Sequence, residues 1–433
     1  MGKGGSASTA SPVEATKATK EPEQVNVYLK GKVVDVTKFL RSHPGGSKAL
    51  KIFKNRDATE QFISYHSPAA HKKLEVMSRG APDAPAEAMV VSTGTIGREF
   101  EEMRQDFVAK GFFDPDVKDE AFKLFITLGP GILGARLLQT GMPCLGAFLI
   151  AFSFYLCGWT AHDYLHHAVF SMGDQTRKSG CSQTQLVLIN NIFGFVLGMW
   201  QGFAPGWWRA RHNTHHLVTN EKGNDPDIKT APVLTFVRGK PELAAMLNFV
   251  QRWQEYYYVP LMALLDVYWR LESIQYCTTR KFKEVWIEYA MMAGHYAILA
   301  WVFQSPDGTG VMWGWMMFMS LVRGFLTGIV VFATHYGEEH LDGGDHKLTL
   351  VEQTSLTSRN ITGGYVVNVL TGYISLQTEH HLFPMMPTAH LEKCQPYVKA
   401  FFKKHNLLYR ESNLVECVKF NIAALRHGKL HLD

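Results

Sequence analysis

The segment HDYLHH (residues 162–167) is one of three short histidine-rich motifs in this chain, together with HNTHH (residues 212–216) and QTEHH (residues 377–381). The three motifs hold eight of the 19 histidines, and each follows an apolar stretch. Imidazole is a common ligand of borderline transition metals, and eight imidazoles are too many for one ion. The motifs therefore predict two metal ions held at a membrane face, where they would carry out oxygen chemistry on a lipid chain.

The spacing within each motif suits metal binding if the motifs are helical. Each residue of a helix advances by about 100°, so the three polar side chains of HNTHH and of QTEHH each fall within an arc of about 100°. In HDYLHH, His162 and His166 lie about 40° apart, whereas His167 points further round and is assigned to a second ion. The candidate catalytic residues are His162, His166, His167, His212, His215, His216, Gln377, His380 and His381. All of them except Gln377 are also candidate metal ligands, with iron, copper or zinc favoured over magnesium or calcium.

Further polar residues accompany the motifs. Metal-bound imidazoles usually donate their second ring nitrogen to a carboxylate or carbonyl, and Asp163, Asp225, Asp227 and Glu379 are expected to accept such bonds. His335, in the segment ATHYGEE, is a candidate ninth metal ligand, although a hydrogen-bonded histidine without a metal is an equal alternative from the sequence alone.

Four apolar stretches are long enough to span a bilayer, which needs roughly 20 residues each. They lie near residues 121–139, 143–161, 285–303 and 311–334. The linkers inside each pair carry no Lys or Arg, so the four spans are expected to form two hairpins that enter from the cytosol. All three motifs would then share the cytosolic face. Two further apolar stretches, 185–204 and 256–269, are expected to be interfacial or buried helices.

A small α+β domain is expected over residues 25–78. Apolar and polar residues alternate around a Lys30–Gly31 turn, and the segment HPGG at residues 43–46 follows a short helical stretch. His43 and His66 flank a compact helical pocket and can clamp a haem iron from both faces. The segments DVTKFLRSHPGG, DATEQF and YHS resemble cytochrome b5, in which His43 and His66 match the two axial positions.

The remaining divisions follow from composition. Residues 1–24 are expected to be a disordered tail, and their Met-Gly-Lys-Gly-Gly-Ser start fits the loose myristoylation pattern at Gly2. Residues 79–118 are expected to be a linker and an amphipathic approach to the membrane, and residues 119–433 the membrane domain.

The net charge of +5 is too small to indicate nucleic-acid binding. The six cysteines form no disulfide framework, which favours a reducing cytosolic face.

The chain from Val25 to about Asn421 resembles the front-end acyl-lipid desaturases that carry a fused N-terminal cytochrome b5 domain. HPGG, HxxxHH, HxxHH and a third motif that begins with Gln377 carry this resemblance. WWRARHNTHH, TLVEQTSLTSRNI and SLQTEHHLFPMMP resemble the microalgal delta-8 enzymes, which act on twenty-carbon polyunsaturated acids.

This resemblance implies a haem domain followed by an all-α membrane domain with a cytosolic helical cap. It also implies haem b, two non-haem iron ions, and electrons from an NADH-cytochrome b5 reductase. The substrate would be a fatty acyl lipid, linked to CoA or to a phospholipid, at the endoplasmic reticulum membrane. His335 resembles an additional iron ligand of related membrane desaturases, in which a polar residue one turn earlier holds water near a metal. Val331 stands at that place here.

Other functions remain open from the sequence. A sphingoid long-chain-base desaturase shares the haem fusion and the glutamine-type third motif, and a hydroxylase shares the first hydrogen abstraction. A histidine-rich metal transporter with a haem domain is an alternative of another class, but it would place its ligands near the bilayer midplane. A non-catalytic haem-binding adaptor would have no use for the three motifs.

Overall fold

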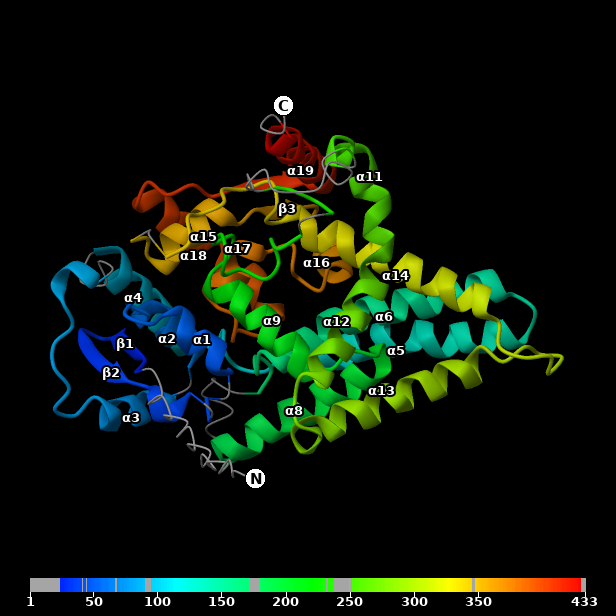
Figure 1. The fold of residues 1–433 in the computed structure, drawn as a ribbon, viewed down its shortest axis with the longest axis horizontal. Helices are drawn as coiled ribbons and strands as arrows, with labels where there is room; N and C mark the ends of the chain where they lie inside the picture. The colour runs from blue at the N-terminus through cyan, green and yellow to red at the C-terminus, as the bar shows by residue number, and fades with distance from the viewer. Residues whose placement is uncertain are drawn as a thin grey trace, which may run out of the picture.

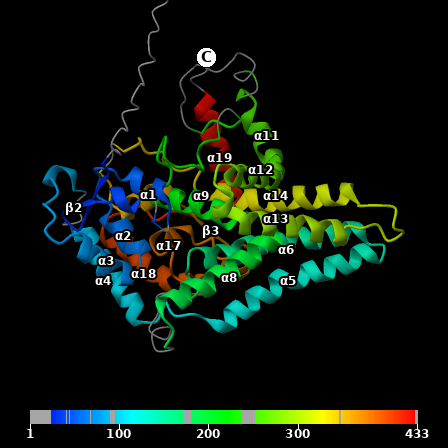
Figure 2. The ribbon, with the colours of Figure 1, turned by 60° about the horizontal axis from the view of Figure 1, so that its bottom comes forward.

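The computed structural model describes residues 24–429, except for residues 41, 44, 67, 90–94, 171–179, 231–232, 237–248, 250 and 345–346. The expected N-terminal tail and Gly2 lie outside the described residues. The chain has a small N-terminal domain at one end, a central group of short helices, and long helices that extend away from both (Figures 1 and 2).

The N-terminal domain begins with a two-stranded antiparallel hairpin whose turn is the expected Lys30–Gly31, with both residues at positive φ. Its elements are β1 (Asn26–Leu29), β2 (Lys32–Asp35), α1 (Ser47–Ile52), α2 (Thr59–Tyr65) and α3 (Pro68–Met77). Alternate strand residues point into its apolar core, which also contains Val218 from the central part of the chain. The small domain is thus packed against the rest of the molecule.

Helices of 8 to 23 residues make up the middle of the chain. They are α5 (Val117–Gln139), α6 (Pro143–Leu165), α8 (Gln183–Gln201), α9 (Pro205–Leu217), α11 (Gln254–Leu261), α12 (Leu265–Thr278), α13 (Phe282–Val302) and α14 (Trp313–Ala333). The α5–α6 and α13–α14 turns lie at the end of the molecule farthest from the N-terminal domain (Figure 1). A Cβ at Gly134 would lie 2.6 Å from the Gly146 carbonyl oxygen, so glycine permits the close packing of α5 on α6.

Three described helices, α5, α6 and α14, are long and apolar enough to cross a bilayer. Helices α8 and α9 make a fourth candidate if they are counted as one span bent by 105°. The number of candidate spans reaches the expected four only with this bent pair, which contains residues 185–204, expected to be an interfacial or buried helix rather than a span. Helix α13, expected to span at residues 285–303, falls short in apolarity, since the buried Glu288 and His295 lie along it.

The sharp bend between α8 and α9 has a local cause. Gly202 ends α8 at a φ of 83°, and a Cβ there would lie 2.3 Å from the Arg270 guanidinium and 2.4 Å from the His295 ring. Pro205 then starts α9, where its fixed φ and missing N–H cost nothing. The bend returns HNTHH, in the second half of α9, toward the end of α6.

The C-terminal part forms a helical cap beside the N-terminal domain. Its elements are α15 (Leu350–Thr357), β3 (Asn360–Thr362), α16 (Gly364–Leu370), α17 (Gln377–Leu382), α18 (Leu391–Lys404), β4 (Glu411–Asn413) and α19 (Leu414–Lys429), with β3 and β4 parallel. Helix α4 (Thr95–Ala109) buries Phe100 and Phe107 against Phe383 and its neighbours in this cap. The apolar face of the expected membrane approach is therefore covered by protein.

A buried polar network joins α8, α12 and α14 near the bend. Asp266 of α12 accepts hydrogen bonds from Arg323 at 2.5 Å and Arg270 at 2.9 Å. Arg323 also donates to the backbone and side-chain oxygens of Gln201 and lies 4.2 Å from the centroid of the Phe203 ring. The cost of placing an arginine within an apolar helix is met by protein partners rather than by extension beyond the lipid.

Candidate metal centre and haem pocket

Five histidines from three separate helices form a first buried group. Their ligand nitrogens all lie within 4.8 Å of one another, and they are His162, His166, His212, His216 and His380. His216 Nε2 lies 2.9 Å from His212 Nε2 and 3.1 Å from His380 Nε2. The end of α6, α9 and α17 therefore supply one nitrogen-rich cage, as the spacing of the motifs predicted.

A second group adjoins the first. His215, His335 and His381 bring their ligand nitrogens within 4.8 Å of one another. The His381 ring stacks on His216 of the first group with a centroid separation of 4.1 Å. Gln377 Nε2 lies 2.7 Å from His335 Nε2 and 2.9 Å from His381 Nε2, so Gln377 lies at this second group.

The unpaired atoms of these groups fit bound metal. Among the described residues, His162 Nε2, His166 Nε2 and Gln377 Oε1 are buried and have no hydrogen-bond partner. Leaving such an atom unpaired costs about 1–3 kcal/mol, and converging imidazole lone pairs cannot satisfy one another without a donor. A cation removes both penalties. All-nitrogen donor sets of this kind suit iron, copper or zinc.

Acceptors outside the groups hold several imidazoles in orientation. His162 Nδ1 lies 3.1 Å from an Asp163 oxygen, and His215 Nδ1 lies 3.0 Å from Asp225. His335 Nδ1 lies 2.8 Å from the Thr357 carbonyl oxygen. Burial lowers the pKa of His335 to about 3, which keeps its ring in the neutral form that binds metal.

Two motif residues have other neighbours. His167 follows the end of α6 at a φ of 58°, which turns its side chain away from both groups. Its Nε2 lies 3.1 Å from Asn191 Oδ1 and 3.3 Å from Arg209. Glu379 accepts hydrogen bonds from Asn360 at 2.7 Å and Tyr409 at 2.5 Å, so it anchors α17 rather than an imidazole.

Sequence reasoning missed a lysine that supports the first group. Lys123 of α5 is buried and lies 3.2 Å from Asp163, the residue that holds His162. It also donates to Thr388 at 2.7 Å and to Glu120 at 2.9 Å. Lys123 lies within the first expected span, and nothing in its local sequence pattern indicates Asp163.

The N-terminal domain contains a pocket that fits haem. His43 and His66 face each other with ring centroids 5.9 Å apart. Their Nδ1 atoms lie 3.1 Å from the carbonyl oxygens of Gly46 and Phe62, which leaves the Nε2 atoms for an iron between the rings. Burial lowers the pKa of His66 to about 4, so the ring stays neutral.

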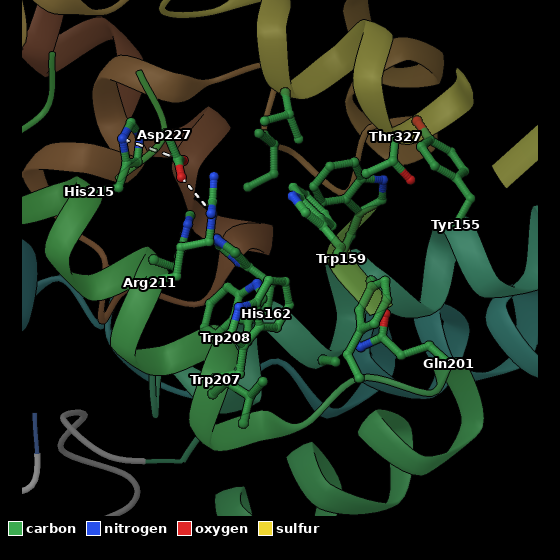
Figure 3. Close-up of a pocket in the computed structure, with 18 of the residues that line it drawn as sticks. Tyr155, Trp159, His162, Gln201, Trp207, Trp208, Arg211, His215, Asp227 and Thr327 are labelled. Atoms are coloured by element: carbon green, nitrogen blue, oxygen red, sulfur yellow. Dashed lines mark ion pairs between the residues drawn. The ribbon is translucent and has the colours of Figure 1, made fainter. Parts of the chain in front are cut away.

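A cavity next to the two groups extends into the membrane helices. His215, Arg211 and Asp227 lie at one end, and Tyr155, Gln201 and Thr327 at the other (Figure 3). Trp159, Trp207 and Trp208 line it between these ends. The volume of the cavity is about 70 Å³, smaller than the several hundred Å³ of a typical ligand pocket.

Several aromatic residues of the sequence could either line a substrate cavity or lie at the membrane interface: Trp207, Trp208 and Tyr256–Tyr258. Of these, Trp207 and Trp208 border the cavity. Tyr256 is exposed, while Tyr258 is fully buried against Phe236 and receives a hydrogen bond from Asn421. Neither Tyr256 nor Tyr258 lines this cavity.

Comparison with known proteins identifies two matched regions. Residues 140–413 match the fatty acid desaturase family, and residues 12–83 match the cytochrome b5-like heme/steroid binding domain. An acyl-lipid 8-desaturase of Rebecca salina is 52% identical, over 98% of this chain and 99% of that protein. A delta(8)-fatty-acid desaturase of Euglena gracilis is 30% identical, over 89% and 90% of the two chains. An acyl-lipid (9-3)-desaturase of Physcomitrium patens is 28% identical, over 93% and 75%.

Proposed function

Because this chain belongs to the fatty acid desaturase family and carries an N-terminal cytochrome b5-like domain, we propose that it inserts a delta-8 double bond into a polyunsaturated twenty-carbon acyl lipid. The observation that carries the proposal is the pair of histidine groups at one end of an apolar cavity. The names of the Rebecca and Euglena relatives support the position of the double bond.

The metal assignment follows the two groups. The first would hold one iron through His162, His166, His212, His216 and His380, and the second another through His215, His335 and His381. When bound, the two irons supply an oxidant made from dioxygen, which can attack an unactivated C–H bond, and the haem supplies electrons. We leave His167 out of this assignment because it lies beside Asn191 and Arg209.

Gln377 would complete the second group. The nitrogen and oxygen of a side-chain amide are assigned from their hydrogen bonds, and rotating this amide would direct Oε1 toward His335 and His381. An oxygen ligand there would supplement three imidazoles. It would also offset the apolar Val331, which lines the cavity at the place where related desaturases have a polar residue.

The side chains around the cavity would position the substrate. Burying each methylene contributes roughly 0.8 kcal/mol, so contact with Trp159, Trp207 and Trp208 would stabilise the acyl chain beside the first group. The far end, at Thr327 and Gln201, would limit how deep the chain enters and thereby select the carbon that lies beside the metals.

We extend the proposal to partners and location. An NADH-cytochrome b5 reductase would reduce the haem, and the enzyme would lie in the endoplasmic reticulum membrane with its haem domain and histidine motifs on the cytosolic face. The division into residues 25–78, 79–118 and 119–433 remains our proposal for the domain limits. The packing of Val218 in the core of the haem domain supports placement of haem and metal groups on one side.

Expression in a host without polyunsaturated lipids tests the function. Candidate acids are fed, and new double bonds are located by mass spectrometry. We expect a new bond at the delta-8 position of twenty-carbon acids, in either the CoA or the phospholipid pool. Unchanged fatty acids together with altered sphingoid bases would favour a sphingoid long-chain-base desaturase instead.

A further inference from the structure

Tyr65 connects the haem pocket with the first metal group. It is the last residue of α2, and the next residue is His66, the proposed axial ligand. The Tyr65 ring meets His216 edge-on, with centroids 6.1 Å apart and ring planes at 75°. One side chain therefore touches a proposed iron ligand while its backbone continues directly into a proposed haem ligand.

Packing alone does not account for the hydroxyl of this tyrosine. Within the part of the chain that the structure describes, the Tyr65 hydroxyl is buried and has no hydrogen-bond partner. A phenylalanine would fill the same space and avoid a penalty of about 1–3 kcal/mol. Packing therefore does not explain why residue 65 is a tyrosine rather than a phenylalanine.

The neighbouring imidazole of His216 also has a buried ring nitrogen without a hydrogen-bond partner among the described residues. This nitrogen is Nδ1, whereas the Nδ1 atoms of His162 and His215 face carboxylates. When Nε2 of an imidazole binds metal, Nδ1 carries the proton and needs an acceptor. The ring that carries the Tyr65 hydroxyl packs against His216, although the hydroxyl and His216 Nδ1 form no hydrogen bond with each other in the structure.

The contact is held by a fixed arrangement of the two domains. Arg56 forms a bidentate ion pair with the buried Glu221, with N–O distances of 3.1 and 3.0 Å. Glu60 accepts a hydrogen bond from the Leu350 backbone nitrogen at 2.5 Å. Arg56 lies just before α2 and Glu60 in its first turn, so these bonds fix the start of the seven-residue helix whose last residue, Tyr65, contacts His216.

We infer that Tyr65 is the bridge through which electrons pass from the haem to the first metal group. The inference rests on the proposed function. In each transfer the reduced haem iron loses one electron, a ferric ion in the first group gains it, and Tyr65 is left unchanged. Two transfers supply the two electrons that each desaturation consumes beyond those of the substrate.

The test compares haem reoxidation in full-length variants. In Tyr65→Leu the aromatic ring is lost, in Tyr65→Phe only the hydroxyl, and Tyr28→Leu changes the tyrosine on β1 of the same domain as a control. The haem of each iron-loaded protein is photoreduced without oxygen, and its return to the ferric state is followed by absorbance. We expect reoxidation to slow about tenfold or more in Tyr65→Leu, less in Tyr65→Phe, and not at all in the control.

Further measurements separate the bridge from a structural role. Haem absorbance, haem potential, iron content and melting temperature should match the wild type in every variant. Reduced methyl viologen, which delivers electrons to the metals directly, should restore double-bond formation in Tyr65→Leu. A wild-type reoxidation rate in Tyr65→Leu with iron bound, or a slower rate explained by a shifted haem potential, would overturn the bridge. A wild-type haem whose reoxidation does not depend on bound iron would overturn the proposed function as well.

Discussion

Lys123 in α5 lies 3.2 Å from Asp163 in α6, and the other oxygen of Asp163 lies 3.1 Å from His162 Nδ1. One buried lysine thus orients the carboxylate that orients a proposed iron ligand. The two helices form the hairpin whose close packing Gly134 permits, so the relationship depends on contact between helices rather than on local sequence.

Replacing this lysine should weaken the first metal group. Lys123→Met leaves Asp163 without its cation, and loss of such outer contacts typically reduces metal affinity or activity by about 10- to 100-fold. Iron content and desaturation rate measure the effect, and Lys118→Met, on the exposed face of α5, is the matched control. Equal iron and equal rates in the two variants would show that Asp163 needs no lysine.

Substitutions of the adjacent residues His166 and His167 should have very different effects on bound iron. His166→Ala removes a nitrogen from the five-histidine group and should lower bound iron and abolish desaturation. His167→Asn should keep its iron, because Asn tolerates a φ of 58° and His167 lies outside both groups. Metal analysis of both purified variants is the measurement, and loss of iron from His167→Asn would return that residue to the ligand set.

Asp266 should be essential for stability. It is buried between Arg270 and Arg323, and its removal leaves two arginines without their carboxylate. Breaking a buried pair in this way costs about 3–5 kcal/mol. We expect Asp266→Ala to lower the melting temperature in detergent far more than Glu284→Ala, at an exposed position of α13. Similar melting temperatures would contradict this role.

Stability should also depend on pH through Glu60. Burial raises the pKa of Glu60 from its ordinary value of 4.5 to about 7, and the nearby carboxylates of Asp57 and Glu352 act in the same direction. The folded protein therefore binds a proton that the unfolded chain has released, so stability falls as pH rises from about 4.5 to about 7. The loss amounts to roughly 3 kcal/mol at most.

Melting curves across this pH range measure that dependence. Glu60→Gln should flatten the fall in stability, because its side chain is neutral throughout, whereas Glu75→Gln on the exposed face of α3 should leave it unchanged. An equally steep fall in Glu60→Gln would mean that other groups cause the dependence.

The sequence predicted those parts of the site that follow from local spacing. His212, His215 and His216 could be placed on one helix face because helical geometry relates residues three and four apart. His335 could be proposed as a further metal ligand because it directly follows the last expected span, residues 311–334. The prediction that His167 binds metal assumed that it continues the helix of HDYLHH. In the structure α6 ends before His167, and the φ of His167 is positive.

Other features depend on contacts between distant segments. Nothing near Lys123 in the sequence indicates Asp163, and nothing near Tyr65 indicates His216. The sequence predicts an amphipathic approach to the membrane within residues 79–118, since periodicity reveals an apolar face but not what covers it. In the structure Phe100 and Phe107 of that face pack against Phe383 of the cap.

Iron and haem content of the purified full-length enzyme tests the central claim most directly. If the two histidine groups form a di-iron centre beside a haem domain, an active sample should contain one haem and two further irons per chain. His380→Ala, which removes a ligand of the first group, should lose non-haem iron while keeping the haem spectrum. An active enzyme whose iron is fully accounted for by its haem would contradict the claim.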